Sequence, residues 1–494
     1  MNEKDGLLVN EAGTSERPTS FLFFLTQFFL PVDNASITLF RIGFGAMFSW
    51  WAWDYLATGL VHSIYIEPKF HFTYLPFDWV QPFRSNGMIA VFLAIVLLGI
   101  LVCAGVFYRW SSLLLALSFT YVFLLERTNY QNHYYLMILI AWWLPWLPLS
   151  RNVSYDGSRN STGFKGTSPR WVLWLLRFHV GLPYVYGGLA KLHGDWLAGE
   201  PMRQILASQS QLPFVGPWFN EEWVVFAFVW GGLLFDLGIV PLLLFKRTRV
   251  VAFLACVGFH LTNAVIFNIH IFPWFMIFAT TLFFEPDWPR RVLGGTPLIF
   301  NTAKSLRWAD MPSRCKWGLG LVFVYCVFQC TWPFRHFLSE GDASWTERSH
   351  MFSWRMMLRG KTAAVRYFVS DDFANETYNP RLRGIISVDQ ANRFPRDPEM
   401  ILQFARHLAR EHQGRTGRVP RVQALVLTSL NGRKPQLFID PNVDLASQPK
   451  YAVFRTWILP LTEPLRETAW KIPLNEWERH MDLPQLPVVN AREP

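Results

Sequence analysis

The feature that most constrains this chain is a series of long apolar segments separated by short polar loops. A helix needs roughly 20 consecutive apolar residues to cross a bilayer, and 51% of the 494 residues are hydrophobic while only 17% are charged. Segments of suitable length and composition lie at 36–59, 87–107, 110–126, 133–149, 171–191, 222–245, 249–268, 270–284 and 316–334. The sequence therefore predicts a membrane all-α bundle of about nine transmembrane helices.

The regions on either side of this series have a different character. The stretch at 21–30, FLFFLTQFFL, is too short to span and precedes Pro31, so we expect an interfacial helix. After about residue 335 the composition becomes mixed and charged, which is typical of a soluble domain. We therefore expect an N-terminal tail with its interfacial helix at 1–35, a transmembrane helical domain at 36–334 and a soluble domain at 335–494.

Within the soluble domain, local patterns favour β structure. The segments 365–369 and 384–388 have the composition of strands. Two further runs, 423–430 and 436–439, are separated by an Asn-Gly dipeptide at 431–432, which is a strong hairpin signal. The pattern predicts a C-terminal α+β domain of mainly β character.

Charge placement predicts the orientation. Basic residues gather in alternate loops, for example at 246–249 and 290–291, whereas the loop after Lys191 contains Asp195 and Glu200. Since positive loops stay in the cytoplasm, we expect a cytoplasmic N-terminus and, with an odd number of spans, an extracytoplasmic C-terminal domain. The net charge of +10 then reflects an integral membrane protein whose partner is the lipid bilayer, in the inner membrane if the source is bacterial, and nucleic acid is not an expected partner.

Lys191 is the first candidate for chemistry. It ends the glycine-containing apolar segment YVYGGLAK, and poor solvation at such a position favours the neutral amine, which is a base. The alternative is a lysine that extends its ammonium group to the interface. We predict that His133, which begins its span at the same face, contacts this amine.

Other polar residues occur inside the predicted spans, where each needs a partner or a task. They are Arg41, Asn132, Arg177, His179, Asp236, His260 and Asn263. Taken singly, each is more often a structural group that bridges helices. Pro183, Gly187 and Gly188 precede Lys191, and they favour either a kinked ligand slot or close helix packing.

The familiar local motifs of soluble enzymes do not occur in a convincing context. The five cysteines indicate neither a disulfide framework nor a metal site, and we find no P-loop, GxGxxG, HExxH or GxSxG motif with the required surroundings. The residues alone therefore indicate a membrane enzyme or transporter with a buried amine base.

Nine short stretches carry a family resemblance. They are FRIGFGAMF (40–48), LPFDW (75–79), NYQNHYYL (129–136), GGLAKLHGDWLAGEPM (187–202), WGGLLFDLG (230–238), FHLTN (259–263), EPDWPRR (285–291), SWRMM (353–357) and FIDPNVDL (438–445). Their order and spacing resemble the vitamin K-dependent gamma-glutamyl carboxylase family, in its shorter bacterial form with a horizontally transferred transmembrane (HTTM) domain.

The resemblance implies an activity and its cofactors. In that family a lysine deprotonates a reduced vitamin K or menaquinol, which reacts with O2 to give a base that removes the γ-proton of a glutamyl side chain, and the carbanion captures CO2. The family's lysine and histidine fall on Lys191 and His133 as catalytic residues. A glutamyl peptide or protein would be the substrate, and a quinone reductase would supply the quinol.

Four more residues are expected to bind the cofactor. Asn132 and Asn263 have amide groups that can hydrogen-bond quinone oxygens. His260, in the family's FHxxN context, and Tyr184 are expected beside them. No metal site is expected.

The chain also departs from the animal members of the family. Ala190 stands where they have a second lysine, and the cysteines of their disulfide have no counterparts. The chain ends soon after the DPNVD stretch, so we do not expect leader-directed carboxylation. We expect the soluble domain to bind the peptide by adding a strand to a sheet edge. A quinol oxygenase without carboxylation, and a transporter with Lys191 in its path, are the alternatives.

Overall fold

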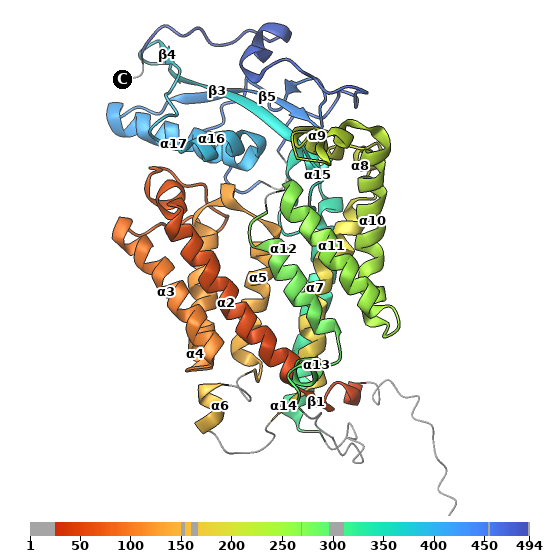
Figure 1. The fold of residues 1–494 in the computed structure, drawn as a ribbon. Helices are drawn as coiled ribbons and strands as arrows, with labels where there is room; N and C mark the ends of the chain where they lie inside the picture. Colours follow the sequence, from red (N-terminus) through yellow and green to blue (C-terminus); the bar gives the residue numbers. More distant parts are fainter. Residues whose placement is uncertain are drawn as a thin grey trace, which may run out of the picture.

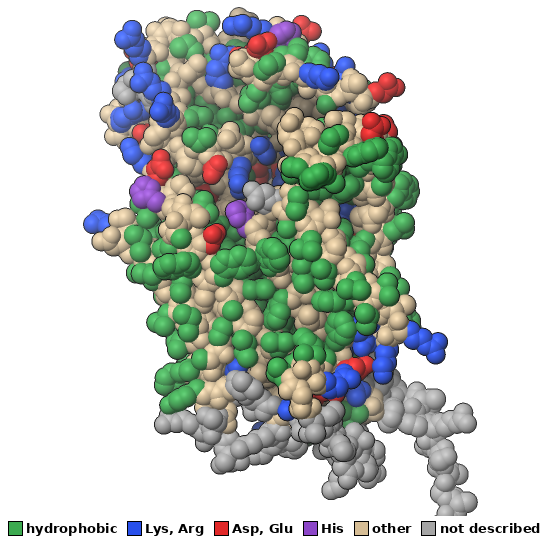
Figure 2. Space-filling view, in the orientation of Figure 1, with side chains coloured by type: hydrophobic (Ala, Val, Ile, Leu, Met, Phe, Trp, Pro, Cys, Tyr) green, Lys and Arg blue, Asp and Glu red, His purple; other side chains and the backbone are tan. Residues whose placement is uncertain are grey.

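A bundle of helices with an α+β unit over one end makes up this computed structural model, which describes residues 25–149, 154–159, 166–267, 269–295, 311–452 and 455–492. The α+β unit lies at the top of Figure 1, over the ends of the long helices. In Figure 2, hydrophobic side chains cover the visible side of the bundle, whereas charged side chains gather on the α+β unit and at the opposite end. This apolar belt between two polar ends has the form of a membrane protein.

Five helical segments among the described residues are long and apolar enough to cross a membrane. They are α3 (Ser85–Ala104), α4 (Tyr108–Leu125), α10 (Glu222–Leu244), α11 (Arg249–Phe267) and the segment Ser313–Leu338 that begins with α14 (Ser313–Thr331). Helices also occupy the other four predicted spans: α2 (Ala35–Ala57), α5 (Asn132–Trp143), α7 (Arg170–Ala190) and α12 (Phe272–Thr280). Because α5 and α12 are short, and α2 and α7 are not among the helices apolar enough to cross a membrane, the count of nine spans stays a prediction.

Short elements complete the two ends of the bundle. The strands β1 (Pro31–Asp33) and β2 (Thr167–Pro169) pair antiparallel at the end far from the α+β unit. The shorter helices are α6 (Tyr155–Arg159), α8 (Gly194–Leu197), α9 (Met202–Ser208), α13 (Trp288–Val292), α15 (Ala343–Thr346) and α16 (Val388–Arg393). The expected interfacial helix at 21–30 lies partly outside the described residues, which begin at Leu25.

The α+β unit is built on a small antiparallel sheet in the order β4-β3-β5-β6. The strands are β4 (Glu376–Tyr378), β3 (Lys361–Asp371), β5 (Arg421–Leu430) and β6 (Gln436–Leu437). Helix α17 (Pro398–Thr416) packs on the sheet, and Ile401 and Phe404 are fully buried in the shared core. The unit is therefore α+β, as expected. Its longest element is the helix α17 rather than a strand, so the β structure is less dominant than the sequence predicted.

The three local strand predictions had different outcomes. The strand expected at 365–369 is confirmed, because these residues lie within β3. The hairpin at 423–439 is confirmed, because β5 pairs with β6 and both Asn431 and Gly432 have the positive φ that an Asn-Gly turn uses. The strand expected at 384–388 is wrong: Gly384 has a φ of 88°, and Ser387 caps α16 by accepting a hydrogen bond from the Gln390 amide. A helix start therefore overrides the β-branched composition there.

The bundle and the α+β unit share buried contacts. The indole of Trp354, with 0% of its surface exposed, belongs to the hydrophobic core of the bundle, and its ring centroid lies 5.0 Å from that of Tyr135. Arg127, beyond α4, forms an ion pair of 2.7 Å with Asp397. The α+β unit is therefore packed on the bundle as one structure.

Candidate active site

A cavity of about 690 Å³ lies where the bundle meets the α+β unit. Its volume falls within the range of small-molecule sites. Helices α5, α7, α10, α11 and α12 form its floor, and the segment 350–359, between α15 and β3, forms its roof. The lining includes all six predicted site residues: Lys191, His133, Asn132, His260, Asn263 and Tyr184.

Lys191 caps the end of α7, and only 6% of its surface is exposed. Its Nζ forms a buried ion pair with Asp236 Oδ2 of α10 and lies 5.2 Å from the centre of the Trp196 ring. The charge is therefore held between a carboxylate and an aromatic face, both favourable partners in an apolar environment.

Two glycines explain how α10 comes close enough to supply this carboxylate. A Cβ on Gly187 would lie 3.3 Å from Asp236 Oδ2, and one on Gly188 would lie 2.7 Å from Leu237 Cδ2. Helix α7 remains continuous through Pro183 as far as Ala190. Of the two readings of these glycines, close helix packing is therefore the one observed.

Two histidine rings lie in the floor with a ring nitrogen that has no hydrogen-bond partner among the described residues. These atoms are His133 Nε2 and His260 Nδ1. The other ring nitrogen of His260, Nε2, lies 2.6 Å from Tyr184 Oη. The His133 ring stacks on Phe272 at 5.2 Å, and His260 meets the same ring edge-on at 5.9 Å. Because unpaired buried nitrogens are costly, a ligand with polar oxygens fits this floor.

One predicted contact is absent from the described part of the chain. His133 and Lys191 line the same cavity, but the contacts of Lys191 are to Asp236 and Trp196 rather than to the imidazole. Asn132 Oδ1 accepts a hydrogen bond of 2.9 Å from Tyr130 Oη. The expected imidazole–amine pair is thus replaced by a carboxylate–amine pair.

The predicted site omitted Asp236 and the whole roof. Asp236 was recognised as a polar residue within a span, and a carboxylate in an apolar helix needs a cation, so Lys191 was its natural partner. The roof contributes His350, Arg355 and Arg359. The SWRMM stretch was the available signal, since it contains Arg355 and is anchored by buried Trp354.

The roof places two guanidinium groups and one neutral imidazole against the cavity. Burial lowers the pKa of His350 to about 3, so its ring is uncharged at neutral pH. Burial also lowers the pKa of Arg359 to about 10, which leaves it a cation that pairs with Glu347. Arg355 donates a hydrogen bond of 3.1 Å to Ser344 Oγ. The roof is therefore cationic.

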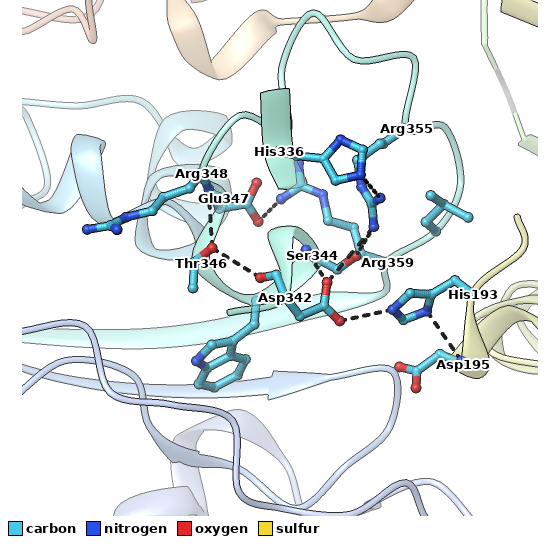
Figure 3. A network of polar contacts seen from close by, with 12 residues as sticks. His193, Asp195, His336, Asp342, Ser344, Thr346, Glu347, Arg348, Arg355 and Arg359 are labelled. Carbon is cyan, nitrogen blue, oxygen red and sulfur yellow. Dashed lines mark hydrogen bonds and ion pairs between the residues drawn. The ribbon is translucent and has the colours of Figure 1, made fainter. Parts of the chain in front are cut away.

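The loop after Lys191 is tied to the roof through His193. Its Nε2 lies 3.2 Å from Asp342 Oδ2, and Asp342 Oδ1 lies 3.9 Å from Arg355 (Figure 3). The hydrogen bond to Asp342 raises the pKa of His193. Although burial opposes ionisation of Asp342, the hydrogen bond from His193 helps to lower the pKa of that carboxyl. Both side chains are partly exposed.

A second tie joins the same loop to the hairpin turn. Arg433 donates two hydrogen bonds to the Asp195 carboxylate, at 2.6 and 2.8 Å, and Asn431 donates a third at 2.8 Å. Burial works against the charge of Asp195, but these donors hold the pKa of its carboxyl below the ordinary value. The loop that follows Lys191 is thus clamped on two sides.

Comparison with known families agrees with this architecture. The model of the HTTM domain matches residues 29–288, and the model of the vitamin K-dependent gamma-carboxylase, lumenal domain, matches residues 314–464. No solved structure matches the chain. The fold and the first match define a membrane protein built on an HTTM helical domain. With the lumenal-domain match, the chain belongs to the vitamin K-dependent gamma-carboxylase family, as the sequence motifs predicted.

Membership of this family has general consequences for the chain. It implies the use of reduced vitamin K, O2 and CO2, and a glutamyl-containing substrate. The word lumenal in the second description points to the extracytoplasmic side for the α+β unit.

Proposed function

We propose that this protein carboxylates glutamyl side chains at the expense of a reduced vitamin K or menaquinol. One quinol, one O2, one CO2 and one glutamyl residue give one quinone epoxide, one γ-carboxyglutamyl residue, one water and one proton. The observation that carries the proposal is the buried Lys191–Asp236 pair in a cavity of about 690 Å³ between the two family domains. Bound quinol supplies the reducing power, and a quinone reductase must regenerate it.

Lys191 accepts the first proton at Nζ. A neutral amine is required for this step, and Asp236 Oδ2, its partner in the ion pair, is the atom that takes the proton of the ammonium. When the proton moves from Lys191 to Asp236, the charged pair becomes a neutral amine and a neutral carboxylic acid, and no water has to enter the cavity. Trp196 covers the amine from one side.

The histidines and asparagines orient the quinol. His133 Nε2 and His260 Nδ1 are free to hydrogen-bond its oxygens, while Asn132 and Asn263 line the same cavity. Tyr184 fixes the orientation of the His260 ring through the 2.6 Å contact to Nε2. We assign catalytic roles to Lys191 and His133 and binding roles to the other four residues.

The cationic roof holds the glutamyl carboxylate. Arg355 and Arg359 line the cavity from the side of the α+β unit, where a peptide would arrive. Strand addition is not part of this proposal, because both outer strands already have neighbours. Ala491 donates its amide to Thr377 O beside β4, and Leu459 donates its amide to Phe438 O beyond β6.

The orientation that suits this chemistry is the one predicted from the loop charges. The loop charges predict a cytoplasmic N-terminus. With nine spans, the cavity mouth and the α+β unit then lie outside, the side to which the word lumenal also points. Cysteines introduced at the exposed positions Phe214, after α9, and Phe373, in the α+β unit, should react with the same impermeant thiol reagent in intact cells, whereas one at Lys246 should react only after permeabilisation. Labelling of positions 246 and 373 from one side would exclude nine spans.

A combined assay tests the activity itself. Purified protein in lipid nanodiscs is given chemically reduced menaquinol, labelled CO2 and a short glutamyl peptide, and O2 uptake and label in the peptide are measured together. The proposal requires both signals. It also requires that the label in the peptide disappear when a glutaminyl control peptide replaces the glutamyl one. O2 uptake without label would indicate a quinol oxygenase, and absence of both would leave the transporter.

A further inference from the structure

A second hollow lies on the outside of the bundle, between α10 and α11. Its volume is about 300 Å³, and most of its lining residues are apolar, such as Leu234, Ile239, Val251 and Ala255, with Arg247 and Thr248 as the polar exceptions. Val251 is 71% exposed and Leu234 is 65% exposed. In the apolar belt these side chains face lipid, so the hollow opens into hydrocarbon.

The hollow adjoins the cavity along the same pair of helices. On α10 the cavity lining ends at Asp236 and the lining of the hollow includes its neighbour Phe235. On α11 the cavity lining begins at Phe259, and the lining of the hollow ends one turn earlier, at Ala255. The rings of Phe235 and Phe259 stack at 4.0 Å with an interplanar angle of 17°. One aromatic pair therefore stands at the junction of the two spaces.

We propose that the α10–α11 hollow binds the isoprenoid tail of the quinol whose ring occupies the cavity, with Phe235 and Phe259 at the passage between them. This inference rests on the proposed function. Phe259, at the cavity, and Val251, in the hollow, are eight residues of helix apart, which is about 12 Å, and an extended chain of a few isoprene units covers that length. An apolar hollow next to a cavity that has polar atoms in its floor matches an amphiphile with a polar ring and an apolar tail.

The opening to lipid determines what the hollow contributes. A tail that leaves hydrocarbon for an apolar groove gains little from the hydrophobic effect, so binding depends on packing against fixed side chains. Filling the groove should therefore weaken binding of a tailed quinone and leave a quinone without a tail unaffected. The competing occupant is the acyl chain of a phospholipid, whose phosphate would meet Arg247.

Ala255 offers the substitution that separates these outcomes. It is exposed and lines the hollow, so Ala255→Phe fills the groove without disturbing the core. Val251→Phe fills it from another position and serves as an independent variant. Leu254→Phe is the matched control, because Leu254 is 63% exposed on the same helix but does not line the hollow.

The probes are 2-methyl-1,4-naphthoquinone and the same ring with a tail of four isoprene units, and their dissociation constants are measured for each protein in nanodiscs. We expect both groove-filling variants to weaken binding of the tailed quinone at least about tenfold and of the tail-free quinone less than twofold, with both constants unchanged in Leu254→Phe. Equal constants for the tailed quinone in all four proteins would overturn the inference. So would phospholipid that copurifies with the unaltered protein but not with the two variants while the tailed quinone binds all of them alike. If neither quinone bound the unaltered protein, the proposed function itself would fall.

Discussion

The floor and the roof of the cavity are built in different ways. The floor consists of membrane helices in which a few polar groups are surrounded by hydrocarbon side chains: the Lys191–Asp236 pair and the rings of His133 and His260. The roof is a connecting segment of the α+β unit, and its arginines have partners of their own, such as Glu347 for Arg359. The floor suits proton transfer, since its ionisable groups are largely buried, and the cationic roof suits binding of a carboxylate.

The largest expected effect is at the base in the floor. Lys191→Ala should lower both O2 uptake and CO2 incorporation by at least about 10²-fold, because it removes the first proton transfer. Lys191→Arg should not restore either, since a guanidinium remains protonated. Lys246→Ala, an exposed lysine at the far end of the bundle, is the control. Normal O2 uptake by Lys191→Ala would place the base elsewhere.

The next effect tests whether Asp236 belongs to the same unit. Asp236→Leu should cost about 3–5 kcal/mol of stability, because it leaves the Lys191 amine buried without its partner. The double variant with Lys191→Leu should regain most of that loss, since an apolar pair suits the site. Thermal unfolding in detergent gives both values. If the two losses simply added, Lys191 and Asp236 would not be coupled.

The roof should affect a different kinetic constant. Arg359→Gln should raise the KM for the glutamyl peptide about tenfold and leave the KM for the quinol unchanged, because the charge that binds the carboxylate is lost. Glu347 keeps an amine partner in this variant, since Lys361 Nζ lies 3.2 Å from it. A rise in the KM for the quinol alone would mean that Arg359 contacts the quinol rather than the glutamyl carboxylate. The proposed division of roles between floor and roof would then be wrong.

The smallest effect concerns the tie between floor and roof. Because the pKa of His193 is raised by Asp342, the pair's contribution to stability is fully present below the ordinary histidine value of 6.5 and is lost as the pH rises through the raised value. Because the pKa of Asp342 is lowered, its contribution to stability is fully present above the ordinary aspartate pKa of 3.8. That contribution is lost as the pH falls through the lowered value. Asp195 also favours the charged imidazole and Arg355 opposes it.

His193→Gln should therefore lower the thermal midpoint between pH 4 and 6.5 and make no difference at high pH. For a pair this exposed, we expect at most about 1 kcal/mol. Unfolding curves of both proteins across this pH range measure the difference. A larger difference at pH 9 than at pH 6 would contradict the assignment.

Much of the site followed from the sequence because an ionisable group in an apolar span is rare and needs a partner. That rule selected Lys191, His133 and His260, which line one cavity, although their roles await the experiments above. The same rule did not predict that Lys191 pairs with Asp236. Helix α10 is apolar all around, and Asp236 is its one charged side chain after the first residue, so no polar face shows how the helix is rotated. Which groups touch is decided by close packing at Gly187 and Gly188.

The fold was also predicted only in part. Apolar runs predicted where the helices lie, and turn chemistry predicted the hairpin at Asn431 and Gly432. The roof escaped prediction because the segment 350–359 has no periodic pattern, and its position depends on Trp354 entering a core made by distant helices. The strand expected at 384–388 failed because its composition said nothing of the capping hydrogen bonds of Ser387.

The clamp between Asp195 and Arg433 has a consequence for how the protein is made. Its two halves are 238 positions apart, so the loop that follows Lys191 is synthesised and inserted long before its anchor exists. A nascent chain therefore has the helices of the HTTM domain in place while the loop after Lys191 is still unanchored, and the anchor forms only when the hairpin has folded. We expect that the helical domain and the lumenal domain are not exchangeable modules, and that a chimaera lacking either Asp195 or Arg433 would have both domains folded but the loop loose.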